Sequence, residues 1–339
     1  MKKYQLIVLG LLPVFVAVLG FCFLSSSSSS TGQVVAPIIS TDSVPLHTHW
    51  STTPPFPEKV DFAGEPMPLN LFDVRESFER ELIVNMNFHS SSLQSIKRIS
   101  RFFPVIEQIL AANGIPDDFK YMALIESDLM NKVSPSGATG FWQFMKGAAS
   151  EYGLEVNAEI DERYHFEKST VAACKYLNAA YSIFGNWTMA AASYNMGKGG
   201  LSDQVKRQQC NYYYDLLLND ETARYIYRIA ALKTILSDPQ KYGFYVPEEE
   251  KYSPIPYTEV KINTAVSDFT EFAFKHQTNY KMLKYLNPWL RDNKLTNAAR
   301  KTYIVKIPAE GFRGDTQHRI DEKEAEKIEE AGKIEEAGK

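Results

Sequence analysis

Residues 121–144 read YMALIESDLMNKVSPSGATGFWQF, and this stretch organises the rest of the chain. It holds one glutamate, Glu126, within an apolar helical pattern, followed by a turn rich in proline, serine and glycine and then a Trp-Gln pair. The apolar residues of this pattern are Met122, Ile125 and Leu129. Their spacing of three and four residues predicts that Glu126 lies on the apolar face of a helix.

Burial on such a face disfavours the charged carboxylate and raises the pKa of Glu126. A raised pKa lets a carboxylic acid keep its proton near neutral pH and donate it during catalysis. Glu126 is therefore our candidate catalytic residue. The alternative is a structural glutamate that pairs with a buried arginine or hydroxyl group.

A second catalytic carboxylate is not evident beside Glu126. Asp128 lies two residues further on, so it is expected on a different side of the helix. Ordinary glycosidases flank the bond they cleave with two carboxylates. A mechanism with one acid must therefore obtain its nucleophile from the substrate itself.

Polar side chains in three further motifs are candidates for substrate binding. Gln143 follows a glycine-rich turn and could offer its amide to sugar hydroxyl or acetamido groups. Tyr194 and Asn195 lie where a short helix gives way to a glycine loop, and Glu221 and Tyr225 lie one helical turn apart. Each of these residues also has a structural interpretation, in the core, in a turn or at a helix start.

The two ends of the chain differ in composition from its middle. Residues 1–30 combine two lysines, a long apolar run and a six-serine run, which predicts a secretory signal peptide or a retained N-terminal anchor. Residues 31–69 are rich in Ser, Thr and Pro and are expected to form a linker. Residues 311–339 form a charged tail that we expect to be disordered.

Between these ends, hydrophobic periodicity predicts two domains. Apolar residues recur at three and four positions through residues 70–245, which predicts a mainly α-helical domain. Residues 246–310 begin with a Pro- and Glu-rich boundary and then alternate strand, helix, helix and strand signals. The expected fold class is therefore mainly α, with a small βααβ module at the end.

Charge and cysteine content exclude several classes of function. The formal net charge of −4 gives no basic footprint, so we expect no nucleic-acid partner. Cys174 and Cys210 could form a disulfide in an oxidising compartment. No Cys/His spacing suggests a metal site, and we expect no cofactor. We also expect a monomer.

Four motifs in order resemble those of the lytic transglycosylases of the soluble-lytic-transglycosylase type, close to the membrane-bound D subgroup. They are ES at 126–127, GATGFWQFM at 137–145, SYNMG at 193–197 and ETARY at 221–225. The resemblance implies a lysozyme-like, goose-type helical fold. It also implies non-hydrolytic cleavage of the β-1,4 bond between N-acetylmuramic acid and N-acetylglucosamine in peptidoglycan, leaving a 1,6-anhydromuramoyl end.

The resemblance also assigns roles to residues. Glu126 would act first as the acid and then as the base, with help from the substrate acetamido group. The residues that would position the acid and the sugar are Ser127, Gln143, Tyr194 and Asn195. Glu221 and Tyr225 match the last motif. Export to the periplasm or cell envelope, either after cleavage of the signal or with the N-terminus retained as a membrane anchor, would bring the enzyme to peptidoglycan glycan strands.

The final module resembles a LysM peptidoglycan-binding module, with Asn287-Pro288 and the closing IVKIP in suitable places. It departs from the family pattern because residues 265–268 read AVSD where Gly-Asp-Thr is usual. The motif after Ser127 also lacks the proline that many relatives carry. Two alternatives remain: a hydrolytic muramidase of goose-type lysozyme character, and a non-catalytic peptidoglycan-binding protein.

Overall fold

The computed structural model describes residues 53–313 and 327–328. The expected signal or anchor, most of the expected linker and nearly all of the expected charged tail lie outside these residues. Within the described part of the chain, no helix combines the length and apolar character needed to cross a membrane.

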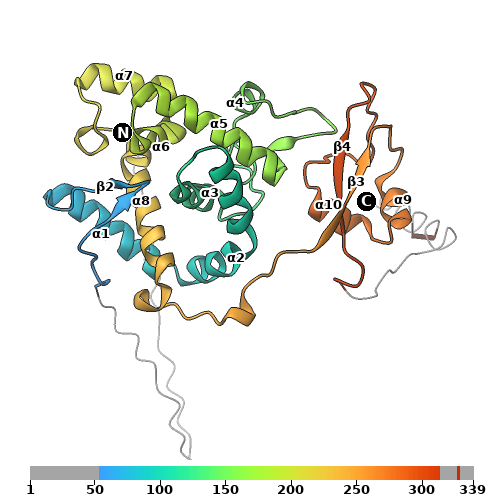
Figure 1. Cartoon of the computed structure of the whole chain (residues 1–339), viewed down its shortest axis with the longest axis horizontal. Helices are drawn as coiled ribbons and strands as arrows, with labels where there is room; N and C mark the ends of the chain where they lie inside the picture. Colours follow the sequence, from blue (N-terminus) through green and yellow to red (C-terminus); the bar gives the residue numbers. More distant parts are fainter. Residues whose placement is uncertain (1–52, 314–326, 329–339) are drawn as a thin grey trace, which may run out of the picture. The chain divides into compact units, whose positions relative to one another are not determined.

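A mainly helical domain occupies the first part of the described chain (Figure 1). Its helices are α1 (Phe72–Asn87), α2 (His89–Ala112), α3 (Lys120–Ser127), α4 (Lys146–Glu151), α5 (Phe166–Phe184), α6 (Trp187–Met196), α7 (Lys198–Gln208) and α8 (Asp220–Ser237). Short 3-10 turns lie at Asp117–Phe119, Glu162–Tyr164, Tyr213–Asp215, Pro239–Tyr242 and Glu248–Glu250. The helices expected from periodicity are all present in this domain.

Local sequence signals set the ends of the helices that carry the site. Gly185 ends α5 with a φ of 76°, a left-handed conformation that glycine adopts without strain. The Asn186 side chain then accepts a hydrogen bond from the Met189 backbone N–H and caps α6. Asn219 caps α8 in the same way through the Thr222 N–H. These caps fix where Tyr194 and Tyr225 project.

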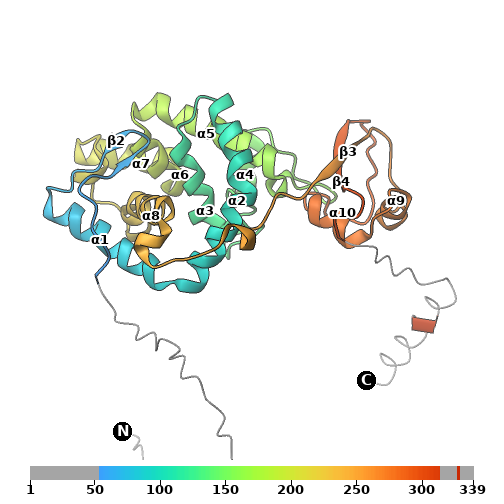
Figure 2. The ribbon, with the colours of Figure 1, turned by 60° about the horizontal axis from the view of Figure 1, so that its bottom comes forward.

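The short helix α3 lies at the centre of the helical domain, with α2, α6 and α8 around it (Figures 1 and 2). Its residues Met122, Ala123 and Leu124 are almost completely buried. Helix α8 packs along both α1 and α3. Burial of this kind stabilises a fold by about 25 cal/mol per Å² of apolar surface. The position of Glu126 is therefore fixed by the core of the domain.

Residues 53–69, which we expected to belong to the linker, contribute to this core. Strands β1 (Asp61–Phe62) and β2 (Glu65–Pro66) pair in an antiparallel hairpin. Val60, Phe62 and Met67 are buried in the same hydrophobic cluster as the helices. The ordered domain therefore begins before residue 70, because these three side chains pack on helices that follow them.

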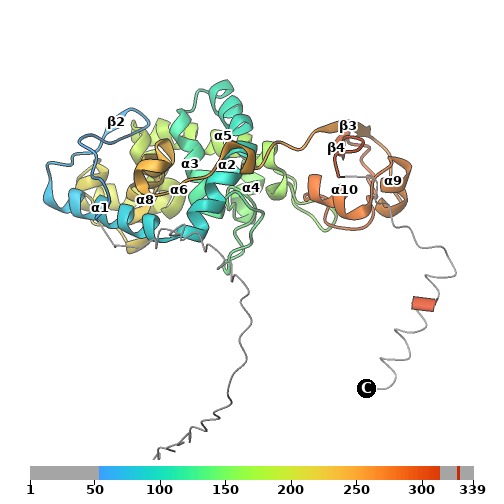
Figure 3. The ribbon, with the colours of Figure 1, turned by 90° about the horizontal axis from the view of Figure 1, so that it is seen from below.

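The last part of the described chain is the small β-α-α-β module. Strands β3 (Tyr257–Ile262) and β4 (Tyr303–Pro308) are antiparallel, and α9 (Phe269–Lys275) and α10 (Tyr280–Leu286) lie between them in sequence (Figure 3). The Asp268 and Asn279 side chains cap the two helices. The module has its own core, made by Phe269, Leu283, Leu295 and Val305.

A loop of the helical domain completes the core of the module. Ile160 is buried in the module's hydrophobic cluster. The backbone N–H of Asp161 donates to the Trp289 carbonyl at 2.9 Å, and the Arg291 N–H donates to the Glu159 carbonyl at 2.7 Å. The two parts are thus joined by backbone hydrogen bonds as well as by the chain between them.

The two cysteines of the described chain are free thiols, and the disulfide that the sequence left open is not formed. Cys174 is buried in the core, where burial raises the pKa of its thiol to about 12. Cys210 lies on a turn, where its sulfur contacts the Tyr212 carbonyl oxygen. Cys174 is therefore an inert packing residue.

Candidate active site

Glu126 lies near the end of α3, half-buried among aromatic side chains. Burial raises the pKa of Glu126 from 4.5 to about 7, against the opposing effects of a hydrogen bond from Tyr225 and the charge of Arg228. The charge of Glu221 adds to the increase in pKa. A carboxyl group with this pKa is present in both protonation states at neutral pH.

Tyr225 holds the Glu126 carboxyl group directly. It lies on α8, is almost fully buried, and donates its hydroxyl to Glu126 Oε1 at 2.5 Å. Burial and the neighbouring Glu126 charge raise the pKa of Tyr225 well above its usual value. The phenol therefore stays protonated and acts as a fixed hydrogen-bond donor.

Tyr194 anchors the glycine-rich segment beside the acid. Its hydroxyl donates to the Trp142 carbonyl at 2.7 Å, and its ring packs edge-on against Trp142 and Phe144. Burial, followed by the charge of Glu126, raises the pKa of Tyr194 well above its usual value. Tyr194 is therefore neutral and close enough to Glu126 to respond to its charge.

Gln143 and Ser127 shape the loop that follows Glu126. Gln143 adopts a positive φ of 47°, and its amide nitrogen donates to the carbonyls of Lys132 and Gly140. Ser127 is buried and donates to the Phe141 carbonyl at 2.9 Å. Both side chains hold the backbone of this loop in place.

Asn195 links α6 to the start of α8. Its amide nitrogen donates to Glu221 Oε1 at 3.1 Å, while its amide oxygen accepts from Thr222 Oγ1 at 2.7 Å. Glu221 is exposed at its end of α8. The structure therefore places Tyr225 and Tyr194 close to the Glu126 carboxyl group and pairs Asn195 with Glu221. Ser127 and Gln143 instead bond to the backbone of the loop that follows the acid.

Two details differ from the expected helix. Helix α3 ends at Ser127, and Asp128 and Leu129 both adopt left-handed conformations with φ of 53° and 54°. Leu129 therefore does not share a helical face with Glu126, although it is buried. Asp128 pairs with Lys132.

Sequence reasoning missed two residues that affect the site. Arg228 contributes positive charge near Glu126, and Thr222 orients the Asn195 amide. Arg228 lies three residues after Tyr225 on α8, so helical spacing could have indicated it. Thr222 gave no signal, because its role depends on how α6 meets α8.

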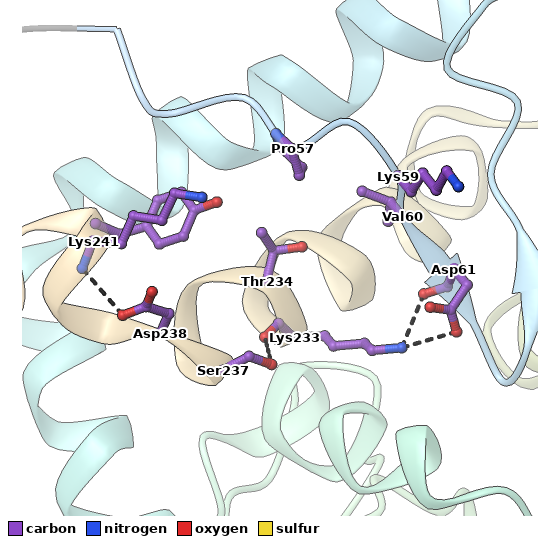
Figure 4. A pocket seen from close by; sticks show the side chains of 10 residues that line it. Pro57, Lys59, Val60, Asp61, Lys233, Thr234, Ser237, Asp238 and Lys241 are labelled. Carbon is purple, nitrogen blue, oxygen red and sulfur yellow. Dashed lines mark hydrogen bonds and ion pairs between the residues drawn. The ribbon is translucent and has the colours of Figure 1, made fainter.

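Another pocket lies away from Glu126, between residues 57–61 and the end of α8 (Figure 4). Lys233 reaches across it to Asp61 at 3.0 Å and also pairs with Asp118 at 2.7 Å. These ion pairs tie the β1–β2 hairpin to the domain. Among the described residues, no group of three or more His, Cys, Asp or Glu side chains could hold a metal ion.

Replacing Tyr225 with phenylalanine is expected to raise the pKa of Glu126, because the lost hydrogen bond favours the carboxylate. The fall in activity at alkaline pH should therefore begin at a higher pH, by up to about one pH unit. Tyr227→Phe on the same helix is the matched control, since its ring packs against Tyr213 and Tyr214. A fall that began at the same or a lower pH in Tyr225→Phe would contradict this assignment.

The described chain is a mainly helical domain that holds the Glu126 carboxyl group in its core, followed by a small β-α-α-β module. Residues 104–215 match the family model of the transglycosylase SLT domain. Residues 258–311 match the soluble lytic transglycosylase C-terminal LysM-like domain. The chain thus contains a transglycosylase SLT domain, followed by a soluble lytic transglycosylase C-terminal LysM-like domain.

The chain is distantly similar to the membrane-bound lytic murein transglycosylase D of Escherichia coli strain K12, and equally to that of E. coli O6:H1 strain CFT073. Each is 27% identical over 199 residues, covering 56% of this chain and 43% of the relative. The chain thus spans less than half the length of these relatives. A crystal structure of an inactive mutant of the lytic transglycosylase Slt from Pseudomonas aeruginosa is 19% identical, with a TM-score of 0.34, over 53% of this chain and 35% of that one.

Proposed function

We propose that this enzyme cleaves the β-1,4 bond between N-acetylmuramic acid and N-acetylglucosamine in peptidoglycan without water. The product would carry a 1,6-anhydromuramoyl end. One observation carries the proposal: Glu126 combines a pKa of about 7 with a fixed hydrogen bond from Tyr225. A single carboxyl group poised in this way can first donate a proton and then accept one.

The first step breaks the glycosidic bond. Protonated Glu126 donates its proton to the glycosidic oxygen, and the electron pair of the bond leaves with that oxygen as a hydroxyl of N-acetylglucosamine. The acetamido oxygen of the muramoyl residue attacks C1 and carries the positive charge. Glu126 becomes a carboxylate, which Tyr225 and the charge of Arg228 stabilise.

The second step closes the anhydro ring. The Glu126 carboxylate takes the proton from the C6 hydroxyl of the same muramoyl residue, and the C6 oxygen attacks C1. The acetamido group leaves C1 as a neutral amide, so Glu126 returns to its protonated state without consuming water. The Gln143 amide oxygen and the Asn195–Glu221 pair are proposed to bind sugar groups during both steps.

The rate is expected to depend on the protonated form of Glu126 in the free enzyme. Because the pKa of Glu126 is about 7, kcat/KM should fall roughly tenfold for each pH unit above 7. A pH–rate profile on a soluble glycan fragment measures this limb. A limb near the ordinary glutamate pKa of about 4.5 would show that Glu126 is not the acid.

Product analysis tests the proposal. Purified peptidoglycan sacculi digested by the enzyme should release muropeptides that lack the mass of one water at the muramoyl end. Products with that water would establish a hydrolytic muramidase instead. No release of fragments by the parent enzyme would leave a peptidoglycan-binding protein. The position of the cut, within glycan strands or at their ends, follows from the fragment lengths.

We propose that the enzyme works in the cell envelope. Its family acts on peptidoglycan, and its N-terminal sequence has the order of charged, apolar and small residues expected for export. Fractionation of cells that express the full chain would show whether the protein stays with the membrane or is released from it.

A further inference from the structure

A cavity of about 530 Å³ lies where the helical domain meets the β-α-α-β module. Its wall includes Phe102 on α2, the loop residues Leu129 and Phe141, the connecting residue Tyr252, and Trp289 of the module. Glu126 is not among its lining residues. Its volume lies within the usual range for small-molecule sites, and such sites often form at the junction of two domains.

The wall of this junction cavity offers ring faces with polar edges. Four tyrosines line it, namely Tyr164, Tyr252, Tyr257 and Tyr285. A tyrosine presents an apolar ring and a hydroxyl group that can donate or accept a hydrogen bond. A sugar has the same two characters, because its C–H faces pack on rings while its hydroxyls form hydrogen bonds. Arg101 already donates to the Tyr285 hydroxyl, whereas a lipid tail offers no hydrogen bond to any of the tyrosines.

Two arginines of α2 give the cavity wall positive charge. Arg98 and Arg101 both line it, and neither forms an ion pair with a carboxylate of the described chain. The Arg101 guanidinium lies over the Tyr252 ring and also bonds to the Ser253 carbonyl and the Tyr285 hydroxyl. These contacts hold it in place without neutralising its charge, so it suits a carboxylate ligand.

The remaining charges of the cavity cancel one another. Lys306 forms an ion pair with Glu167 at the wall. Burial alone would raise the pKa of Glu167. Contacts with His165 and Lys306 outweigh this effect and lower that pKa to about 2. This pair is therefore charged on both sides and neutral as a unit. The net charge that a ligand meets comes from Arg98 and Arg101.

We propose that the junction cavity is a second, non-catalytic site that binds a carboxylate-bearing sugar, namely a muramoyl residue of the glycan. This identity rests on the proposed function, since the lactyl carboxylate distinguishes muramic acid from its neighbour in that polymer. The sugar ring packs against the aromatic wall, and its carboxylate binds between Arg98 and Arg101. The enzyme thereby holds glycan at two places.

The cavity also borders the loop of residues 128–145, which follows the helix that carries Glu126. Phe141 lines the cavity with its side chain, and its carbonyl accepts the hydrogen bond from Ser127, the residue after Glu126. Leu129, two residues further on, lines the same cavity. A sugar in the junction cavity therefore contacts the segment that carries the acid, although it does not contact the acid.

Calorimetric titration of the full chain carrying Glu126→Gln tests this proposal without cleavage. The probe is the disaccharide of N-acetylglucosamine and N-acetylmuramic acid. We expect two binding events, and either Arg98→Ala or Arg101→Ala should weaken one of them roughly tenfold or more. The matched control is Arg207→Ala, on α7, whose guanidinium bonds to Gln204 alone among the described residues. It should leave both events unchanged.

Three outcomes would overturn the proposal. They are equal binding of the uncharged disaccharide of N-acetylglucosamine, unchanged binding in both arginine variants, and saturation of the cavity by anionic lipid vesicles in place of the sugar. Melting temperatures of both variants within a few degrees of the parent show that the module has stayed in place. Product mass reports on the proposed function separately, because Arg98 and Arg101 lie outside the catalytic site.

Discussion

Glu126→Gln is expected to reduce cleavage of peptidoglycan by at least about a thousandfold, because one group supplies both proton transfers. Glutamine fills the same volume and can still accept the Tyr225 hydrogen bond, so folding should be retained. It cannot donate a proton of suitable acidity or accept one. Release of soluble fragments from sacculi measures the loss.

The same variant should be more stable than the parent at alkaline pH. The pKa of Glu126 is about 7 in the folded protein, against 4.5 when unperturbed, so the folded state holds a proton that the unfolded state has lost between these values. The parent therefore loses stability as pH rises from about 4.5 to 7. Glu126→Gln avoids this loss, which amounts to up to about 3 kcal/mol above pH 7 and vanishes near pH 4.

The matched control is Glu107→Gln. Glu107 lies on α2 and pairs with Lys120, the first residue of α3, at 2.7 Å. Its replacement should leave both activity and the pH dependence of stability close to those of the parent. If Glu126→Gln degraded sacculi at the parent rate, the assignment of the catalytic residue would be wrong.

Gly140→Ala is expected to cost roughly 3 kcal/mol or more in free energy of unfolding. A Cβ atom at this position would lie 2.0 Å from the Arg163 carbonyl oxygen, which is backbone and cannot move aside cheaply. The φ of 85° is also strained for alanine. The measurement is the midpoint of urea unfolding. Activity should fall too, since Gln143 bonds to the Gly140 carbonyl.

Gly137→Ala, in the same turn, is the matched control. Gly137 has a similar φ of 87°, but a Cβ atom there meets nothing within 4 Å. Gly137→Ala should therefore lower the free energy of unfolding by only about 1 to 2 kcal/mol, the cost of a positive φ for alanine. Equal losses in the two variants would show that strain rather than the close approach to Arg163 requires the glycine at position 140.

Helical periodicity was sufficient to predict most of the fold. The mainly helical character of residues 70–245 and the strand, helix, helix, strand order of the module are as expected from the sequence pattern. Local signals such as caps and glycines act within one turn of chain, so they can be read from sequence. The family models confirm the resemblance to the SLT and LysM-like domains.

Features that depend on distant contacts were not predictable. The hydrogen bond from Tyr225 to Glu126 joins residues 99 apart in the chain. The core role of Phe62 depends on packing against Phe119, because its own segment has no sustained period. The junction cavity likewise requires that α2, the loop of residues 128–145 and the module meet. No local pattern signals such contacts.

Digestion of purified peptidoglycan in water enriched with a heavy oxygen isotope tests the central claim most directly. If Glu126 delivers the muramoyl C6 hydroxyl to C1, mass spectrometry of the released muropeptides will show anhydro ends that carry no heavy oxygen, and none of these products will form with Glu126→Gln. Heavy oxygen at the muramoyl C1 would show that water is the nucleophile, and would contradict the account.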